Sequence, residues 1–147
     1  MPDTRSRVPA NTSVEINQRI QAEIAARVGS YARHPAEIPH RLRDLDEEWD
    51  IERAIEANAS ALGFVGVALG ATRDRRWLIL PSLVTAFLFQ HAIQGWCPPV
   101  PILRRLGFRT AQEIEQERNA LKALRGDFDP VRQSSDPAAA ALKAVNA

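Results

Sequence analysis

Two long stretches without a charged side chain constrain what this chain can fold into. The first runs for sixteen residues from Ala57 to Thr72, and the second runs for twenty-seven residues from Trp77 to Leu103. An Arg-rich tetrad at 73–76 separates them. A helix that is apolar on all sides has to be buried in protein or in lipid. We therefore predict a central apolar hairpin of two helices joined by the tetrad.

The overall composition conceals this division. The 147 residues are 45% hydrophobic and 25% charged, with nineteen basic and eighteen acidic side chains and a net charge of +1. That average is typical of a soluble globular domain. A near-neutral total gives no general affinity for polyanions, so we predict no nucleic-acid partner. The single cysteine excludes an intramolecular disulfide.

Three amphipathic helices are predicted outside the hairpin. A capping-box pattern at Thr12–Glu15, followed by apolar residues at every fourth position, predicts a helix over about 13–28 that Gly29 ends. Apolar spacing along His40–Asn58 predicts a second helix with an acidic opposite face. A second capping box predicts a third helix over Thr110–Arg125. No alternating strand pattern competes with these helices, so the predicted fold class is all-α.

The chain divides into five predicted segments. They are a disordered N-terminus over 1–11, amphipathic charged helices over 12–56, the apolar hairpin with a Cys-Pro-Pro exit over 57–109, an amphipathic helix over 110–126 and a disordered tail over 127–147. Disorder is predicted at the ends because they are rich in polar residues and proline.

The two hairpin helices have lengths suited to a bilayer. As a helix, Ala57–Thr72 would be about 24 Å long and Trp77–Trp96 about 30 Å, against a hydrocarbon core of roughly 30 Å. Trp77 and Trp96 bracket the second helix, as aromatic residues do at membrane interfaces. We therefore predict a lipid bilayer as partner. The alternative is a soluble bundle whose amphipathic helices bury the hairpin, which the mean hydropathy of −0.26 favours.

Small and polar residues mark the contact surfaces of the hairpin. Gly66 and Gly70 form a GxxxG pattern that Gly63 extends, which predicts close packing against another helix. The second helix carries a polar patch that should face another helix rather than lipid. We predict that this patch is an interhelical hydrogen-bond clasp formed by Gln90, His91 and Gln94.

Cys97 is a candidate functional thiol at the exit from the second helix. Three prolines in the four positions 98–101 end that helix. A thiol at a helix C-terminus meets the negative end of the helix dipole, which opposes thiolate formation. A structural role for Cys97 is therefore the simpler interpretation, and a reactive thiol is the alternative.

A longer motif pattern connects these features. Glu52-Arg53 and Asn58 precede the Gly-rich helix, and Gly95-Trp96-Cys97-Pro98 leads to Leu106-Gly107-Phe108-Arg109-Thr110. Over about residues 50–110 this pattern resembles the two-helix transmembrane domain of the YgaP-type inner membrane proteins. The resemblance implies a hairpin in the bacterial inner membrane. Some members of that family carry a rhodanese sulfurtransferase domain, but nothing in this chain matches one, so the sulfur chemistry does not carry over.

A hairpin places both termini on one side of the membrane. Arginines on the flanks of the hairpin outnumber those in its turn by six to three, and the positive-inside rule then predicts cytoplasmic termini. The six flanking residues are Arg41, Arg43, Arg53, Arg104, Arg105 and Arg109.

Three classes of function fit these features. The first is a membrane-embedded structural or interaction protein whose charged helices face a protein partner or a second copy of the chain. The second is a sulfur or redox carrier acting through Cys97, and the third is a soluble all-helical interaction module. The chain has no phosphate loop, metalloprotease motif or nucleophile elbow. We therefore predict no enzyme activity, cofactor, metal site or small-molecule substrate.

Overall fold

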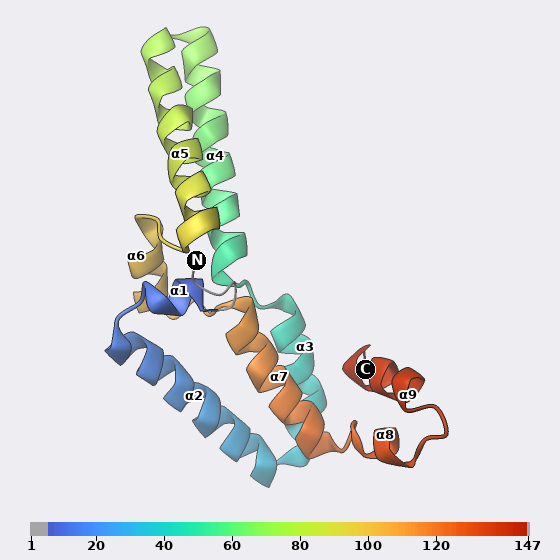
Figure 1. Ribbon diagram of the computed structural model, residues 1–147. Helices are drawn as coiled ribbons and strands as arrows, with labels where there is room; N and C mark the ends of the chain where they lie inside the picture. Colours follow the sequence, from blue (N-terminus) through green and yellow to red (C-terminus); the bar gives the residue numbers. More distant parts are fainter. Residues whose placement is uncertain (1–5, 147) are drawn as a thin grey trace. The chain divides into compact units, whose positions relative to one another are not determined.

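The computed structural model describes residues 6–146 as an all-α protein, and these residues form no strand (Figure 1). This confirms the predicted fold class. The chain divides into two compact units. Unit 1 comprises Met1–Ile20 and Trp49–Gln112, and unit 2 comprises Gln21–Glu48 and Glu113–Ala147.

Unit 1 contains the predicted hairpin. Helices α4 and α5 pack side by side with the short 3₁₀ helix η2 in the turn between them, and α4 also contacts α6. The helices of this unit, with the part of α2 that belongs to it, are α1 (Arg7–Ala10), α2 (Val14–Arg33), α4 (Ile51–Thr72), η2 (Arg75–Leu78), α5 (Ile79–Gln94) and α6 (Pro99–Arg105).

Helix α4 begins after a break that the sequence analysis missed. We predicted one helix over His40–Asn58, but α3 (Ile38–Glu47) ends first and α4 starts at Ile51. Between them Asp50 is extended, and its carboxylate accepts a hydrogen bond of 2.7 Å from the backbone N–H of Arg53. This cap satisfies an N–H in the first turn that has no partner within the helix, so a new helix starts here.

Two glycines allow α4 to approach the start of the second hairpin arm. A Cβ at Gly66 would lie 2.5 Å from the ring Cδ of Pro81, and one at Gly70 would lie 2.6 Å from Leu78. Pro81 is the third residue of α5, where its missing N–H removes no helical hydrogen bond. Gly63 differs, because a Cβ there would have no neighbouring atom within 4 Å.

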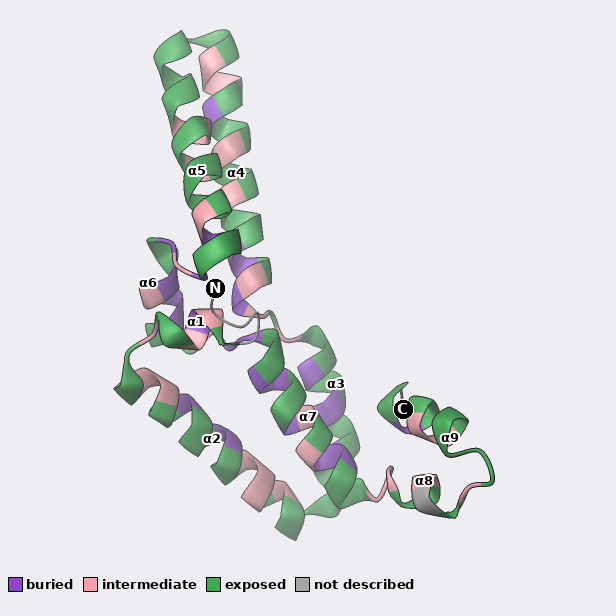
Figure 2. Ribbon diagram, in the orientation of Figure 1, coloured by how far each residue is buried: buried purple, intermediate pink, exposed green. Residues whose placement is uncertain are grey.

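The apolar side chains of the hairpin are mostly exposed (Figure 2). Of the nineteen exposed large hydrophobic residues in the described chain, twelve lie between Leu62 and Ile93. Two stretches, one that ends with α4 at Thr72 and one over Arg75–Gln94, contain apolar segments with mean hydropathies of 1.4 and 1.3, of which 22% and 6% are buried. By length and composition, both are long and apolar enough to cross a membrane.

Hydroxyl groups on the hairpin bond to its own backbone. Thr72, Ser82 and Thr85 each donate a hydrogen bond to the carbonyl oxygen four residues earlier, at 2.7, 2.9 and 2.8 Å. Each hydroxyl therefore has its partner within its own helical segment and needs none from the surroundings of the hairpin.

The base of the hairpin is packed around an apolar core and a buried arginine. The core is formed by Val8, Ile51, Ala54, Ile55, Cys97, Val100 and Leu103. Beside it Arg104 is fully buried. Its guanidinium donates to the Asn17 side chain at 2.9 Å and to the Phe108 carbonyl at 3.1 Å. Arg104, which we counted among the charged flanks, therefore lies inside unit 1.

Unit 2 is built around a second apolar core. Its members are Ile38, Leu42, Leu45, Ile114 and Leu121, with Tyr31 packed against them. The helices of this unit, with the rest of α2 and with α3, are η1 (Pro35–Glu37), α7 (Ala111–Arg125), α8 (Asp129–Gln133) and α9 (Pro137–Asn146). Gly126 follows α7 with a φ of 87°, as the capping pattern predicted.

Two boundaries in this part of the chain differ from the prediction. Gly29 does not end α2, which continues to Arg33 and stops before His34-Pro35. Proline forces the residue before it out of the helical region, and His34 has φ −129° and ψ 62°. The tail that we predicted as disordered from residue 127 contains α8 and α9. Proline in the first turn of each helix and the alanine run in α9 favour helix at these positions.

The N-terminal segment also differs from the prediction. Of the residues 1–11 that we predicted as disordered, residues 1–5 lie outside the described chain, and α1 forms within the remainder.

We predict opposite effects for alanine at two glycines of α4. Gly66→Ala should lower the free energy of unfolding by about 1 to 3 kcal/mol, because its Cβ would overlap the Pro81 ring. Gly63→Ala should raise it by up to about 1 kcal/mol, because it improves helix propensity in open space. Thermal unfolding of the full chain followed by circular dichroism measures both. Equal effects would contradict the close approach at Gly66.

A second prediction concerns Glu117, a fully buried carboxylate of α7. It forms ion pairs with Arg41 at 2.8 Å and with Arg27 at 3.3 Å. Glu117→Gln should lower the free energy of unfolding by about 3 to 5 kcal/mol, since it removes the buried charge that both arginines share and puts an amide NH₂ donor in its place. Glu23 is a matched control, because it pairs with the same Arg27 at 4.0 Å but is half exposed. Glu23→Gln should cost less than about 1 kcal/mol in the same unfolding measurement.

Candidate functional site

Four side chains from separate segments meet at the base of the hairpin. Glu52 comes from the first turn of α4, His91 from the last turn of α5 and Arg7 from α1. Cys97 lies in the exit between α5 and α6. We call these four residues the base cluster.

The carboxylate of Glu52 joins two of the other members. One oxygen, Oε2, lies 2.6 Å from Nε2 of His91, and the other, Oε1, lies 3.3 Å from the guanidinium of Arg7. Because an ionised carboxylate only accepts hydrogen bonds, Nε2 of His91 carries the proton in this pair. The pairing fixes the orientation of the imidazole and leaves Nδ1 on the opposite side of the ring.

Helix α1 completes the end of α5. The Arg7 guanidinium donates to the carbonyl of Ala92 at 2.7 Å, and the Asn11 side chain donates to the carbonyl of Gln94 at 2.8 Å. These carbonyls belong to the last turn of a helix, where no helical N–H is available to them. Both contacts hold α1 against the hairpin base.

Gly95 allows the chain to turn back at this point. It has a φ of 73°, a left-handed conformation that favours glycine, and a Cβ there would lie 2.6 Å from the backbone of Arg7. Glycine at this position therefore permits both the left-handed turn and the close approach of the α1 backbone. The turn returns Cys97 to the core beside α4.

The thiol of Cys97 lies beside the imidazole of His91. The two side chains interact, and they are 2% and 3% exposed. Within the described residues, Nδ1 of His91 is buried and has no partner with full hydrogen-bond geometry. Glu52 holds the other ring nitrogen.

Glu52 precedes the charge-free stretch, and its pKa is shifted. The hydrogen bond from His91 lowers the pKa of the Glu52 carboxyl, burial opposes this shift, and the charges of His91 and Arg7 add to it. Glu52 therefore stays ionised and available to the imidazole in moderately acidic solution.

An apolar groove leads along the hairpin to Cys97. It has a volume of about 320 Å³ and runs between α4 and α5. We call it the hairpin groove, and residues that line it include Ala59, Leu62, Leu83, Phe87, Cys97 and Pro98. Asn58 also lines it, but its amide donates to the Ala54 carbonyl at 2.8 Å and is used within α4.

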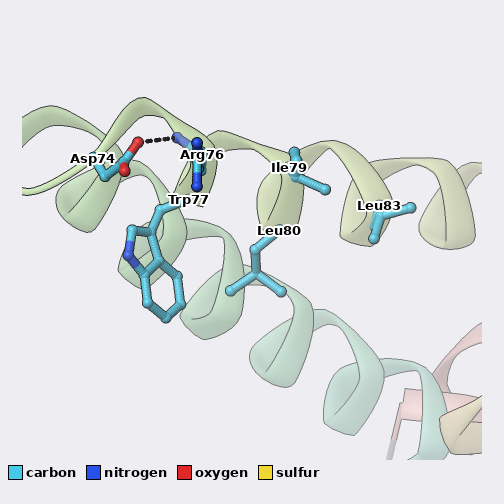
Figure 3. Close-up of a pocket in the computed structure, with 6 residues that line it drawn as sticks. All are labelled: Asp74, Arg76, Trp77, Ile79, Leu80 and Leu83. Carbon is cyan, nitrogen blue, oxygen red and sulfur yellow. Dashed lines mark hydrogen bonds between the residues drawn. The ribbon is translucent and has the colours of Figure 1, made fainter.

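A second hollow lies at the other end of the hairpin (Figure 3). Asp74 accepts a hydrogen bond of 2.8 Å from the backbone N–H of Arg76 and so caps η2. Trp77 follows, at the point where the charged turn gives way to the apolar helix. The hollow joins these residues to Ile79, Leu80 and Leu83. The turn is thus polar at its tip and aromatic at its edge.

The structure separates the residues that we predicted as one polar clasp. His91 reaches across the hairpin to Glu52, whereas Gln90 donates to Gln94 at 3.4 Å along α5 itself. Sequence analysis did not assign Glu52 or Arg7 to a site. Glu52 is one of the last three charged residues before the charge-free stretch, and this position was a usable signal for a polar residue at the hairpin base. Nothing in the sequence around Arg7 indicates its role.

No cluster of metal ligands was found in the described chain. Among residues 6–146, no group of three or more His, Cys, Asp or Glu side chains is placed to hold a metal ion. The base cluster offers Glu52, His91 and Cys97 in a row, with the imidazole between the carboxylate and the thiol.

Comparisons with protein-family models, with curated proteins and with solved structures give no match for this chain. The resemblance to the YgaP-type transmembrane domain over residues 50–110 therefore stays a prediction that rests on its motifs.

The lowered pKa of Glu52 predicts a pH-dependent contribution to stability. The contribution is fully present above the ordinary glutamate pKa and is lost as the pH falls through the lowered pKa of the folded state. Glu52→Gln should therefore cost about 1 to 2 kcal/mol at neutral pH and much less in acid. Thermal unfolding across a pH series measures the difference. A constant difference, or an equal one in the exposed control Glu56→Gln, would contradict the role of the carboxylate.

Proposed function

We propose that this chain is a membrane-embedded helical-hairpin protein with a structural or interaction role. The observation that carries the proposal is the exposed apolar surface of α4 and α5 (Figure 2). Soluble monomers rarely leave a contiguous apolar patch of more than a few hundred Å² in water. Phe64 and Phe89 are 76% and 68% exposed, and they represent the lipid-facing residues of the two helices.

The ends of the hairpin suit the two surfaces of a bilayer. Trp77 and the arginines at 73–76 fit the headgroup region at the turn, because aromatic and basic side chains favour that layer. The base cluster suits the second membrane surface, at the opposite end of the hairpin. There Glu52 pairs with both Arg7 and His91 where the apolar surface ends. Between these ends, the hydroxyl groups of Ser82 and Thr85 bond to the helix backbone, as a segment in hydrocarbon requires.

The charged helices supply the surface for interaction. Side chains on the outer face of α3, such as Asp44 and Glu47, are exposed, and Asp46 pairs with Arg118 of α7. We propose that a protein partner or a second copy of the chain binds this surface. The proposal places it in the cytoplasm and the hairpin in the bacterial inner membrane, on the arginine count and the resemblance given above. It includes no enzyme activity, no cofactor and no nucleic-acid partner.

Carbonate extraction and single-cysteine labelling test this proposal. Cys97 is buried, so Cys97→Ser provides a background into which exposed cysteines are placed at Arg75, in the turn, and at Ser135, in the C-terminal part. We expect the full chain to stay in the carbonate-washed membrane pellet. A membrane-impermeant maleimide should label Arg75→Cys in intact cells and Ser135→Cys only after permeabilisation.

Each alternative gives a different result in this experiment. Release of the chain into the carbonate supernatant would contradict the membrane proposal and favour a soluble module whose hairpin is covered by another copy. Retention in the pellet with the reversed labelling pattern would contradict the cytoplasmic termini alone. Unmodified Cys97→Ser protein controls for labelling that does not depend on the introduced cysteines.

A further inference from the structure

The turn of the hairpin carries a positive charge that the chain itself does not neutralise. Arg73, Arg75 and Arg76 are exposed, and no acidic side chain within the described residues pairs with their guanidinium groups. Asp74 is the only acidic residue from 57 to 112, and its carboxylate caps η2 through the backbone N–H of Arg76. Three positive charges and one negative charge leave the turn at +2. Guanidinium groups present N–H donors in a planar arrangement that matches the oxygen atoms of a phosphate.

An apolar surface continues from these charges into α5. The hollow of Figure 3, which we call the tip hollow, has a volume of about 430 Å³ and is lined by Asp74, Arg76, Trp77, Ile79, Leu80 and Leu83. Arg76, Ile79 and Leu83 follow one another at helical spacing and span roughly 10 Å along the chain. Ile79 and Leu83 are 62% and 53% exposed, so the described chain leaves this surface open.

The charged and apolar parts of the tip hollow together select the class of ligand. A free phosphate would use only the guanidinium groups, and an uncharged apolar molecule would use only the aliphatic side chains. A phospholipid uses both, because its phosphate is joined to its acyl chains through the glycerol. The net charge of +2 favours an acidic lipid over a zwitterionic one, which brings its own ammonium group. Trp77 also lines the hollow, and indole rings favour the layer beside lipid headgroups.

We propose that the tip hollow binds one anionic phospholipid. The inference rests on the proposed insertion of the hairpin in a bilayer, and it names a lipid partner for the turn. Arg76 donates hydrogen bonds to the lipid phosphate, and Ile79 and Leu83 contact the upper part of an acyl chain. Arg73 is not part of the lining and contributes only through its charge.

Fluorescence quenching in vesicles tests this inference. The full chain with Trp49→Phe and Trp96→Phe keeps Trp77 as its single tryptophan. It is reconstituted into phosphatidylcholine vesicles that contain a small fraction of brominated phosphatidylglycerol or of brominated phosphatidylcholine. Because bromine quenches indole fluorescence on contact, quenching reports which lipid lies in the hollow. We expect phosphatidylglycerol to associate on the order of fivefold more strongly, the effect of one arginine near an anionic surface.

Two arginines of equal charge separate a binding site from a merely charged surface. Arg76 lines the hollow and Arg73 does not. Arg76→Gln should reduce the preference for phosphatidylglycerol to less than about twofold, because the phosphate loses its charged hydrogen-bond donor. Arg73→Gln should change the preference by less than about twofold, because salt screens a charge that makes no direct contact. Circular dichroism confirms that each variant is folded.

Inorganic phosphate distinguishes a lipid site from a site for free anions. The quenching measurement is repeated in phosphate and in chloride buffers of equal ionic strength. We expect the same preference for phosphatidylglycerol in both, because free phosphate makes no contact with the apolar part of the hollow. Loss of the preference in phosphate alone would show a site for free anions and would overturn the inference.

Equal quenching by the two lipids would also overturn the inference, as would an equal loss of preference in Arg73→Gln and Arg76→Gln. Flotation of the vesicles on a density gradient shows whether the chain is associated with them. Vesicles that float without the chain would contradict the membrane proposal and the inference together. Flotation with the chain, combined with equal quenching, would contradict the inference alone.

Discussion

The hydrogen bond between Glu52 and His91 is the interaction on which the base of the hairpin depends. The two residues are thirty-nine positions apart in the chain, at the start of α4 and the end of α5. Closing the hairpin at the turn alone would leave its open ends free to separate. A charge-assisted hydrogen bond at the base holds them together, and such bonds are stronger than those between neutral groups. Arg7 adds a third segment by contacting Glu52 and the last turn of α5 together.

The same contact determines the environment of Cys97. With Nε2 held by Glu52, the imidazole is fixed at the buried base of the hairpin together with the thiol. The dipole of α5 opposes a negative charge at this position, which led us to favour a structural cysteine from the sequence. The imidazole is a buried neighbour of the thiol that sequence spacing did not identify.

Sequence reasoning was most successful where a pattern is continuous along the chain. The charge-free stretches correctly predicted the hairpin. The capping box and Gly126 predicted the bounds of α7 to within one residue. It failed at Gly29, which we predicted to end α2. Pro35 is the stronger signal for the end of that helix, because it forces His34 out of the helical region. The site was harder to predict, because Arg7 and His91 are brought together only by the fold. The approach at Gly66 was predictable as a motif, but its partner Pro81 was not.

Buried charges explain how a chain with a small apolar core holds distant segments together. Arg104 in unit 1 bonds to the start of α2 and to Phe108, and Glu117 in unit 2 pairs with arginines of α2 and α3. A buried charge stabilises only when all of its partners are in place, so it favours one arrangement over other compact ones. Apolar contacts alone distinguish poorly between alternative helix pairings. Within the part of the chain that the structure describes, no ion pair joins the two hairpin helices along their charge-free length, and close packing at Gly66 takes that role.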